Sequence, residues 1–219
     1  MTLSLEDREA WLARWREGRT RFHLDQVHPA LMRYIGQLMS SGRILVPLCG
    51  KSLDLGWLKD HGYDVVGVEL AEQAVSELFE QLELEPTRTP AGAFEIWESP
   101  GLSVDVGDMF ELTTDIAGTF DAVWDRAALI ALNPADRVRY APHVLSFLNK
   151  GSPVLLSALL YDQQKMSGPP FSVNDDEIHR LYAACQSLEK LQSKNVTSRN
   201  PMFIEAGLDA VTEHIWLIK

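Results

Sequence analysis

The sequence lacks the features that mark disulfide-rich, membrane-spanning and secreted proteins. Its two cysteines, Cys49 and Cys185, are too few for a disulfide framework and wrongly spaced for a zinc site. No apolar run approaches the ~20 residues of a membrane-spanning helix. Charged residues interrupt the N-terminal stretch, so we expect no signal peptide. We therefore expect a cytoplasmic protein that does not enter a membrane.

Positive charge is also scarce. The chain has 31 acidic side chains against 20 lysines and arginines, and its formal net charge is −11. Such a surplus repels nucleic acids and anionic lipids, so we expect neither as a partner. With 219 residues, 46% of them hydrophobic, the chain suffices for one domain with a sizeable core. We expect a single monomeric domain over 1–219, with a helical N-terminal cover (1–42) and an α/β core (43–219).

Glycine is scarce where it would be most diagnostic, in the turn after the first expected strand of the stretch 43–70, which offers only Gly50. The apolar run Ile44–Val46 predicts a buried strand, Gly50 a turn and Ser52 a helix cap, and a second apolar run stops at Glu69. An acid at the end of the second strand, about 20 residues past a glycine turn, is the spacing that binds a ribose. The stretch therefore predicts a βαβ unit that binds a nucleoside-bearing cofactor.

The single glycine of this turn distinguishes between the classes of cofactor that the unit could bind. A phosphate loop ending in Gly50-Lys51-Ser52 needs a glycine five positions before Gly50, where Leu45 stands, so a nucleotide triphosphatase is disfavoured. A dinucleotide site needs three glycines for the backbone to approach a pyrophosphate. An adenosyl cofactor without phosphates, such as S-adenosylmethionine, tolerates this turn. An ordinary crossover with a solvated Glu69 stays open as the alternative.

Beyond this unit, strands and helices alternate. Further strands are expected at 94–97, 102–106, 120–124, 153–160, 188–196 and 210–218, and 86–92 is expected to be a loop. Such alternation predicts a mainly parallel sheet covered by helices on both faces. The last two strands have no helix between them, so we expect them to be antiparallel.

A turn glycine and several charged residues lie at the ends of successive expected strands, where open α/β sheets bind their ligands. These residues are Gly50, Glu69, Asp108 and the pair Asp125-Arg126. Their convergence favours a binding site over a plain scaffold. The first helix places Trp11 and Trp15 on one face, which more often indicates docking of a terminal helix than ligand contact.

Several segments resemble one family. The run VPLCGKSLDLGWL…VVGVEL is similar to the cofactor-binding unit of the thiopurine S-methyltransferases. Further segments that resemble this family are WLARWREGRTRFH, FDAVWDRAALIALNPADR, YDQ and GPPFSV. The resemblance covers nearly the whole chain and is weaker after Asn195. It implies a single class I methyltransferase domain: a doubly wound, mostly parallel, Rossmann-like seven-stranded sheet with an antiparallel C-terminal strand and an N-terminal helical lid.

The resemblance also implies which residues bind the cofactor, S-adenosyl-L-methionine. They correspond to Trp11, Leu48, Gly50, Glu69, Asp108, Met109 and Arg126. Glu69 would accept hydrogen bonds from the ribose hydroxyls, and the Asp108-Met109 position would lie along the adenine. The segment 11–22 would fold over the cofactor, so Trp11 would both dock the helix and touch the ligand.

The resemblance assigns the catalytic role to Arg126. This arginine would hold the anion of an acidic aromatic thiol, so that no strong base is needed. Surface pairing of Arg126 with Asp125 or Asp136 is the alternative. The acceptor would bind to Phe22, Phe171 and Arg199. Arg199 rests on a looser match, and a solvated loop charge is its alternative. We expect no metal.

The implied function is transfer of a methyl group from S-adenosylmethionine to the sulfur of aromatic or heterocyclic thiols such as thiopurines, by in-line displacement. His23 and His28 are open as proton shuttles, although a loop histidine is more often only hydrogen-bonded. Two other functions stay open. One is methylation of another soft nucleophile, such as a small metabolite thiol or a selenium or tellurium compound. The other is a non-enzymatic nucleoside-binding module.

Overall fold

The computed structural model describes residues 2–219, which form two compact units that meet in the sequence between Trp124 and Asp125. Each unit has secondary structure and buried residues of its own. The single domain expected over 1–219 stays a prediction. Among the described residues, no helix has the length and apolar character needed to cross a membrane.

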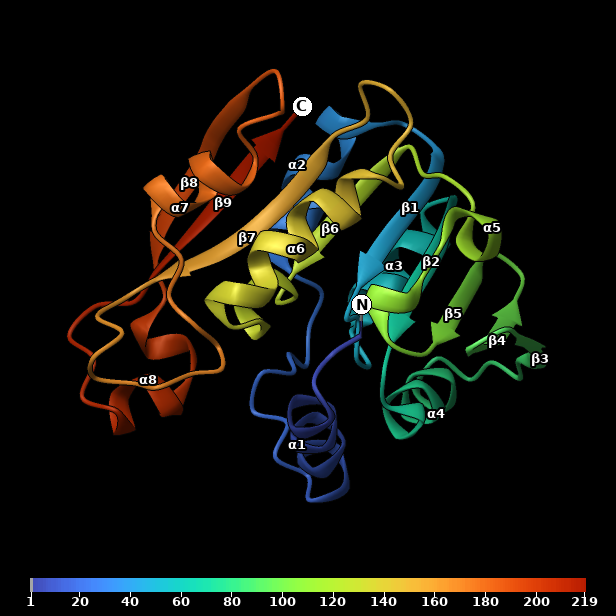
Figure 1. The fold of residues 1–219 in the computed structure, drawn as a ribbon, viewed down its shortest axis with the longest axis horizontal. Helices are drawn as coiled ribbons and strands as arrows, with labels where there is room; N and C mark the ends of the chain where they lie inside the picture. Colours follow the sequence, from blue (N-terminus) through green and yellow to red (C-terminus); the bar gives the residue numbers. More distant parts are fainter. Residues whose placement is uncertain (1) are drawn as a thin grey trace. The chain divides into compact units, whose positions relative to one another are not determined.

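The first unit contains most of the parallel strands (Figure 1). Its elements are α1 (Leu5–Arg16), α2 (Pro29–Leu38), β1 (Gly42–Pro47), α3 (Leu53–Asp60), β2 (Tyr63–Glu69), α4 (Glu72–Gln81), β3 (Thr87–Ala91), β4 (Phe94–Ser99), β5 (Leu102–Val106), the 3-10 turn η1 (Met109–Glu111), α5 (Thr114–Ala117) and the first part of β6 (Ala122–Arg126).

The second unit begins with the end of β6. Its other elements are η2 (Leu129–Ala131), α6 (Pro134–Leu145), β7 (Val154–Leu160), α7 (Asp175–Leu181), β8 (Leu188–Asn195), η3 (Thr197–Arg199), α8 (Pro201–Glu205) and β9 (Thr212–Ile218).

The sheet of the first unit runs in the order β3-β4-β5-β2-β1-β6. Strand β2 pairs in parallel with β1 on one side and β5 on the other, with Val65 opposite both Ile44 and Leu102. Strand β1 also pairs in parallel with β6. Continuous apolar runs form these central strands because both of their faces are buried. The α/β class and the parallel centre of the sheet are confirmed.

The expected count of seven strands is too low, because the described residues contain nine. The stretch 86–92, expected to be a loop, holds β3, which pairs antiparallel with β4 from Thr87 opposite Glu98 to Ala91 opposite Phe94. Strand β3 is exposed along most of its length and contains Pro90. An edge strand tolerates proline and needs no apolar pattern, so its sequence does not differ from that of a loop.

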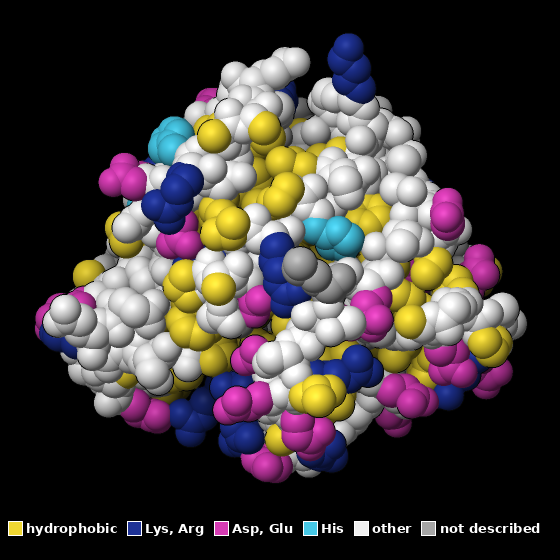
Figure 2. Space-filling view, viewed as in Figure 1, with side chains coloured by type: hydrophobic (Ala, Val, Ile, Leu, Met, Phe, Trp, Pro, Cys, Tyr) yellow, Lys and Arg dark blue, Asp and Glu magenta, His cyan; other side chains and the backbone are white. Residues whose placement is uncertain are grey.

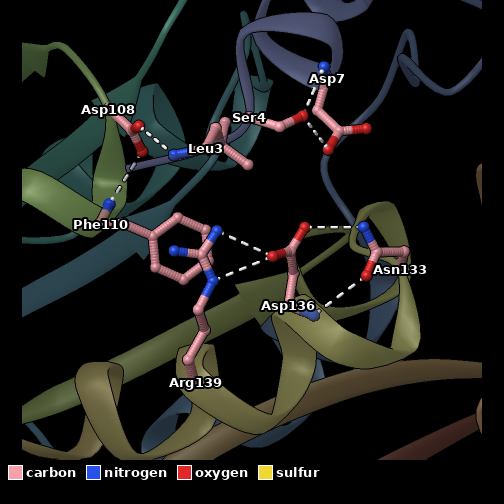
Figure 3. A network of polar contacts seen from close by, with 8 residues as sticks. All are labelled: Leu3, Ser4, Asp7, Asp108, Phe110, Asn133, Asp136 and Arg139. Atoms are coloured by element: carbon pink, nitrogen blue, oxygen red, sulfur yellow. Dashed lines mark hydrogen bonds and ion pairs between the residues drawn. The ribbon is translucent and has the colours of Figure 1, made fainter. Parts of the chain in front are cut away.

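In the second unit β9 lies between β7 and β8 and is antiparallel to both. The antiparallel pairing expected for the last two strands is confirmed, but the expectation that no helix lies between them is wrong, because the short helix α8 does. Helix α6 begins where the Asn133 side chain accepts a hydrogen bond from the backbone N–H of Asp136 at 3.0 Å. The Asp136 carboxylate in turn pairs with Arg139 at 2.8 Å (Figure 3).

Acidic and basic side chains are interspersed over the face drawn in Figure 2. Many of the basic side chains are in surface ion pairs, such as Arg88 with Glu72 at 3.0 Å and Lys165 with Asp209 at 2.6 Å. Exposed pairs of this kind contribute little to stability, on the order of 0–1 kcal/mol each.

A buried polar network joins three elements of the first unit. The Asp54 carboxylate, at the start of α3, accepts hydrogen bonds from the backbone N–H of His28 at 2.7 Å and from Nε1 of Trp124 at 2.8 Å. All three residues are buried, and Nδ1 of His28 accepts from the N–H of Ala30 at the start of α2. His28 is therefore a buried helix cap, in agreement with the alternative that this histidine is hydrogen-bonded.

We expect Asp54→Ala to lower the free energy of unfolding by about 3 kcal/mol, because it leaves two buried donors without an acceptor. Asp60→Ala on the same helix is the control, since the Asp60 side chain is 69% exposed. Urea denaturation of both variants measures the difference. A wild-type midpoint for Asp54→Ala would show that the network does not stabilise the fold.

Candidate functional site

The turn after β1 has an unusual backbone. Leu48 and Gly50 both have left-handed conformations, with φ of 48° and 54°. For leucine this conformation costs on the order of 1–2 kcal/mol, and such strain is concentrated at ligand sites. A Cβ added to Gly50 would lie 3.1 Å from the ring of Trp15, so this position favours glycine for space as well as for φ. The turn therefore presents its backbone at the carboxyl end of β1.

Glu69 ends β2 beside this turn. One of its carboxylate oxygens accepts from the N–H of Gly50 at 2.8 Å and the other from the N–H of Ala71 at 2.9 Å. The residue is 8% exposed, and burial raises the pKa of the carboxyl, while the two N–H groups favour the charged form. Each oxygen keeps acceptor capacity, so the carboxylate can receive two hydroxyl groups from a ligand.

Asp108 follows β5 and lies on the same edge of the sheet. Its carboxylate accepts from the N–H of Phe110 at 3.0 Å, which caps η1, and from the N–H of Leu3 at 2.7 Å (Figure 3). The N–H of Gly107 donates to the carbonyl of Glu69 at 2.9 Å, which ties the ends of β2 and β5 together. The structure therefore brings Leu48, Gly50, Glu69, Asp108 and Met109 to one edge.

The N-terminal segment packs against this edge through Trp15. Trp15 is the buried residue of α1 and forms a cluster with Ala71 and Ala74, against which Phe22 packs. The ring of Phe22 meets the rings of Trp11 and Trp15 edge-on, with centroids 5.9 and 5.5 Å apart. Docking by this helix is thus confirmed, and Trp15 is its anchor. Its contact with Gly50 joins positions 35 residues apart, which spacing alone does not reveal.

The donors and acceptors on this edge fit a nucleoside without phosphates. A buried carboxylate with spare acceptor capacity suits the two hydroxyls of a ribose. The single turn glycine exposes few N–H groups for a pyrophosphate. Among residues 2–219 no group of three or more His, Cys, Asp or Glu side chains is arranged to hold a metal ion.

Arg126, the last residue of β6, belongs to the second unit and is half-buried. Ala127 after it has φ of 72°, a strained value for a residue other than glycine. Asp125 before it is fully buried and accepts from the N–H of Leu129 at 3.1 Å and from the hydroxyl of Tyr140 at 2.8 Å. Burial raises the pKa of Asp125 to about 6. These contacts hold the backbone on both sides of Arg126.

Phe171 lies in a loop between β7 and α7. Its N–H donates to the carbonyl of Ile130 at 2.7 Å, and its ring lies under the guanidinium of Arg137, 5.5 Å from the ring centroid. A cavity of about 440 Å³ opens beside it, with Arg137, Tyr161, Phe171 and Glu177 in its wall. The structure thus places Phe171 at a cavity large enough for a small aromatic ring.

Arg199, in η3, pairs with Glu213 at 3.0 Å. Its side chain is 28% exposed, and Glu213 is buried and also accepts from the hydroxyl of Ser157 at 3.3 Å. The suggestion that Arg199 is only a solvated loop charge is therefore wrong. Sequence pattern did not reveal Glu213 as its partner, because the pair is formed between η3 and a neighbouring strand.

A mainly parallel central sheet, a glycine-poor first turn and a buried carboxylate at the end of the second strand define a class I, S-adenosylmethionine-dependent methyltransferase. Comparison with known proteins gives the family. Residues 6–219 match the family model described as thiopurine S-methyltransferase (TPMT). This chain belongs to the thiopurine S-methyltransferase family.

Related proteins agree with this assignment. A thiopurine S-methyltransferase of Bordetella petrii is 44% identical over 204 residues, covering 92% of this chain and 93% of that one. One of Pseudomonas aeruginosa is 42% identical over 211 residues, covering 95% and 97%. The 1,6-didemethyltoxoflavin-N1-methyltransferase of Burkholderia thailandensis has a similar structure, with a TM-score of 0.65 and 17% identity over 97% of this chain and 87% of that one. The expected methyltransferase fold is confirmed.

Proposed function

We propose that this chain transfers the methyl group of S-adenosylmethionine to the sulfur of aromatic and heterocyclic thiols such as thiopurines. The observation that carries the proposal is the match to the thiopurine S-methyltransferase family over residues 6–219. The buried Glu69 carboxylate at the end of β2 supports it, because its two oxygens suit the hydroxyls of a ribose.

In this proposal the first unit binds the cofactor. Glu69 holds the ribose, Leu48 and Gly50 present the backbone of the turn, and Asp108 with Met109 lies along the adenine. Trp11 covers the ligand from α1, whose anchor Trp15 keeps the helix close to Gly50. A helix that covers the site excludes water, which strengthens the electrostatic interactions inside it.

When bound, S-adenosylmethionine would supply a methyl group on a positively charged sulfonium for in-line transfer to the acceptor thiolate, which would leave a neutral thioether. Correct alignment of the two reactants supplies several kcal/mol of the rate enhancement. Arg126 holds the acceptor as its anion, since an aromatic thiol ionises near neutral pH. Phe22 and Phe171 provide flat apolar walls, and Arg199 is a further contact for the acceptor.

The proposal also covers the domain organisation, oligomeric state and location of the enzyme. We propose a single-domain monomer that acts in the cytoplasm, without a metal, on small-molecule thiols. The high surplus of acidic side chains supports small-molecule over nucleic-acid substrates.

We expect saturable binding of S-adenosylmethionine and of S-adenosylhomocysteine in calorimetric titrations, and transfer of labelled methyl to a thiopurine. The acceptor panel would add benzenethiol, an alkyl thiol and an aromatic selenol. Absence of cofactor binding at high micromolar concentration contradicts the cofactor assignment. Binding without transfer to any acceptor indicates a nucleoside-binding module instead, and transfer to the selenol alone indicates the other class of soft nucleophile.

A further inference from the structure

Arg137 has a position that the proposed reaction does not by itself explain. It lies on α6 and is 1% exposed. We propose that Arg137 is a positioning residue for the methyl acceptor, because it sets the orientation of the Phe171 ring. The inference rests on the proposed function, in which Phe171 is a wall of the acceptor site.

The Arg137 guanidinium joins three segments of the second unit. Its Nε donates to the carbonyl of Leu132 at 2.9 Å, before α6 begins. Its Nη1 donates to Glu177 of α7 at 3.0 Å and to the carbonyl of Ser172 at 3.4 Å. One of these acceptors, Ser172, is the residue next to Phe171 in sequence, and the guanidinium itself lies over the Phe171 ring. Arg137 therefore contacts both the backbone and the ring environment of this loop.

The backbone of the loop also has several hydrogen bonds that do not involve Arg137. The N–H of Phe171 donates to Ile130, and the N–H of Val173 donates to the carbonyl of Leu159 at 2.7 Å. The hydroxyl of Tyr161 donates to the carbonyl of Pro170 at 2.5 Å. Loss of the guanidinium therefore leaves the course of the loop largely intact. It is the ring of Phe171 that loses its neighbour.

The ring of Phe171 has no polar group of its own, so packing alone decides its orientation. One neighbour is Gly168, where an added Cβ would lie 2.5 Å from the ring. Another is the guanidinium of Arg137, 5.5 Å from the ring centroid. A cation over an aromatic face is an oriented attraction. Without it the ring is free to turn into the cavity beside it, where the acceptor's own ring would stack.

Stability alone is a poor reason for this arrangement. A buried ion pair is often no more stabilising than apolar side chains of similar volume. Here Nη2 of Arg137 is buried and has no hydrogen-bond partner among residues 2–219, which adds to the cost of burial. An arginine buried at such a cost is better explained by the orientation it imposes on its neighbours.

The experiment compares Arg137→Met, which keeps an unbranched side chain of similar volume but removes the charge, with Arg137→Lys, which keeps the charge. Arg180→Met is the matched control, because Arg180 is exposed on α7. For Arg137→Met we expect the KM for a thiopurine to rise about tenfold. The kcat and the Kd of S-adenosylmethionine should stay within about twofold of wild type. Arg137→Lys should recover part of the loss, and Arg180→Met should match wild type.

Combination with Phe171→Leu tests the route of the effect. If Arg137 acts through the ring, Arg137→Met raises KM no further once Phe171 is leucine. Additive effects of the two substitutions, an unchanged KM in a folded Arg137→Met, or an equal loss of cofactor affinity would each overturn the proposal. If Arg137→Met does not fold, the KM of Arg137→Lys is the deciding measurement. This variant lacks the forked guanidinium, so a wild-type KM for it would contradict a positioning role for Arg137. Failure of the proposed function itself is distinguishable, because wild-type enzyme would then methylate no thiol.

Discussion

Replacing Glu69 by alanine should weaken binding of S-adenosylmethionine about 100-fold or more. The carboxylate has two oxygens with acceptor capacity left after the N–H groups of Gly50 and Ala71 are satisfied. Hydrogen bonds to a charged group contribute about 1.5–3 kcal/mol each. Loss of two such bonds to the ribose corresponds to at least about 3 kcal/mol, or two orders of magnitude in Kd.

The same substitution should leave the fold intact. Burial raises the pKa of Glu69, so the charged carboxylate is less favourable in the folded protein than in the unfolded chain. Removing the carboxylate removes this cost of burial. The two N–H groups that lose their acceptor offset this gain. Calorimetric titration gives the affinity and thermal unfolding gives the stability. Glu72→Ala is the control, since Glu72 is on the adjoining helix and is an exposed partner of Arg88. An unchanged Kd in Glu69→Ala would rule out the ribose assignment.

Arg126→Ala should lower kcat for thiopurine methylation by about 100-fold to 1,000-fold, the range found when one charge-stabilising group is removed from an active site. The hydrogen bonds of the buried Asp125 restrain the backbone from which Arg126 projects, and Ala127 after it has a left-handed φ. A preorganised charge is more effective than a mobile one because it needs no reorganisation during the reaction.

The acidity of the acceptor gives this prediction a second readout. If Arg126 holds an anion, the loss in Arg126→Ala should be greatest for thiols that are ionised at the assay pH and smaller for neutral ones. Arg126→Lys should retain part of the rate, since it keeps the charge but not the bidentate geometry. Rapid-quench transfer of labelled methyl separates the chemical step from product release. Full turnover by Arg126→Ala would show that catalysis lies elsewhere.

Elements with a strong local pattern were predictable. The strands β1 and β2, the turn at Gly50 and the acid at Glu69 follow from apolar runs and from one spacing, because buried parallel strands need continuous apolar sequence. The antiparallel final pair was predicted because no helix was expected between its strands; the pairing is correct, although the structure has η3 and α8 between them. Strand β3 was missed because an exposed edge strand carries no such pattern.

Partners of individual side chains were not predictable. The contact of Trp15 with Gly50, the pair of Arg199 with Glu213 and the contacts of Arg137 join positions that are distant in the sequence. Such contacts depend on how elements pack, and many packings satisfy the same periodicity. The same limit applied to His28, whose loop position suggested a hydrogen bond but not its partner, the N–H of Ala30 at the start of α2.

The sequence by itself determined the α/β class, the cofactor-binding βαβ unit and, through its motifs, the family. These features depend on periodicity and on spacings of about 20 residues or less, which local chain geometry transmits directly to structure. Only the tertiary structure decided that Glu69 is held by two backbone N–H groups, that Trp15 anchors α1, and that Arg137 lies over Phe171. Those contacts arise when separate elements pack at close distance, and no local pattern specifies which side chains then meet.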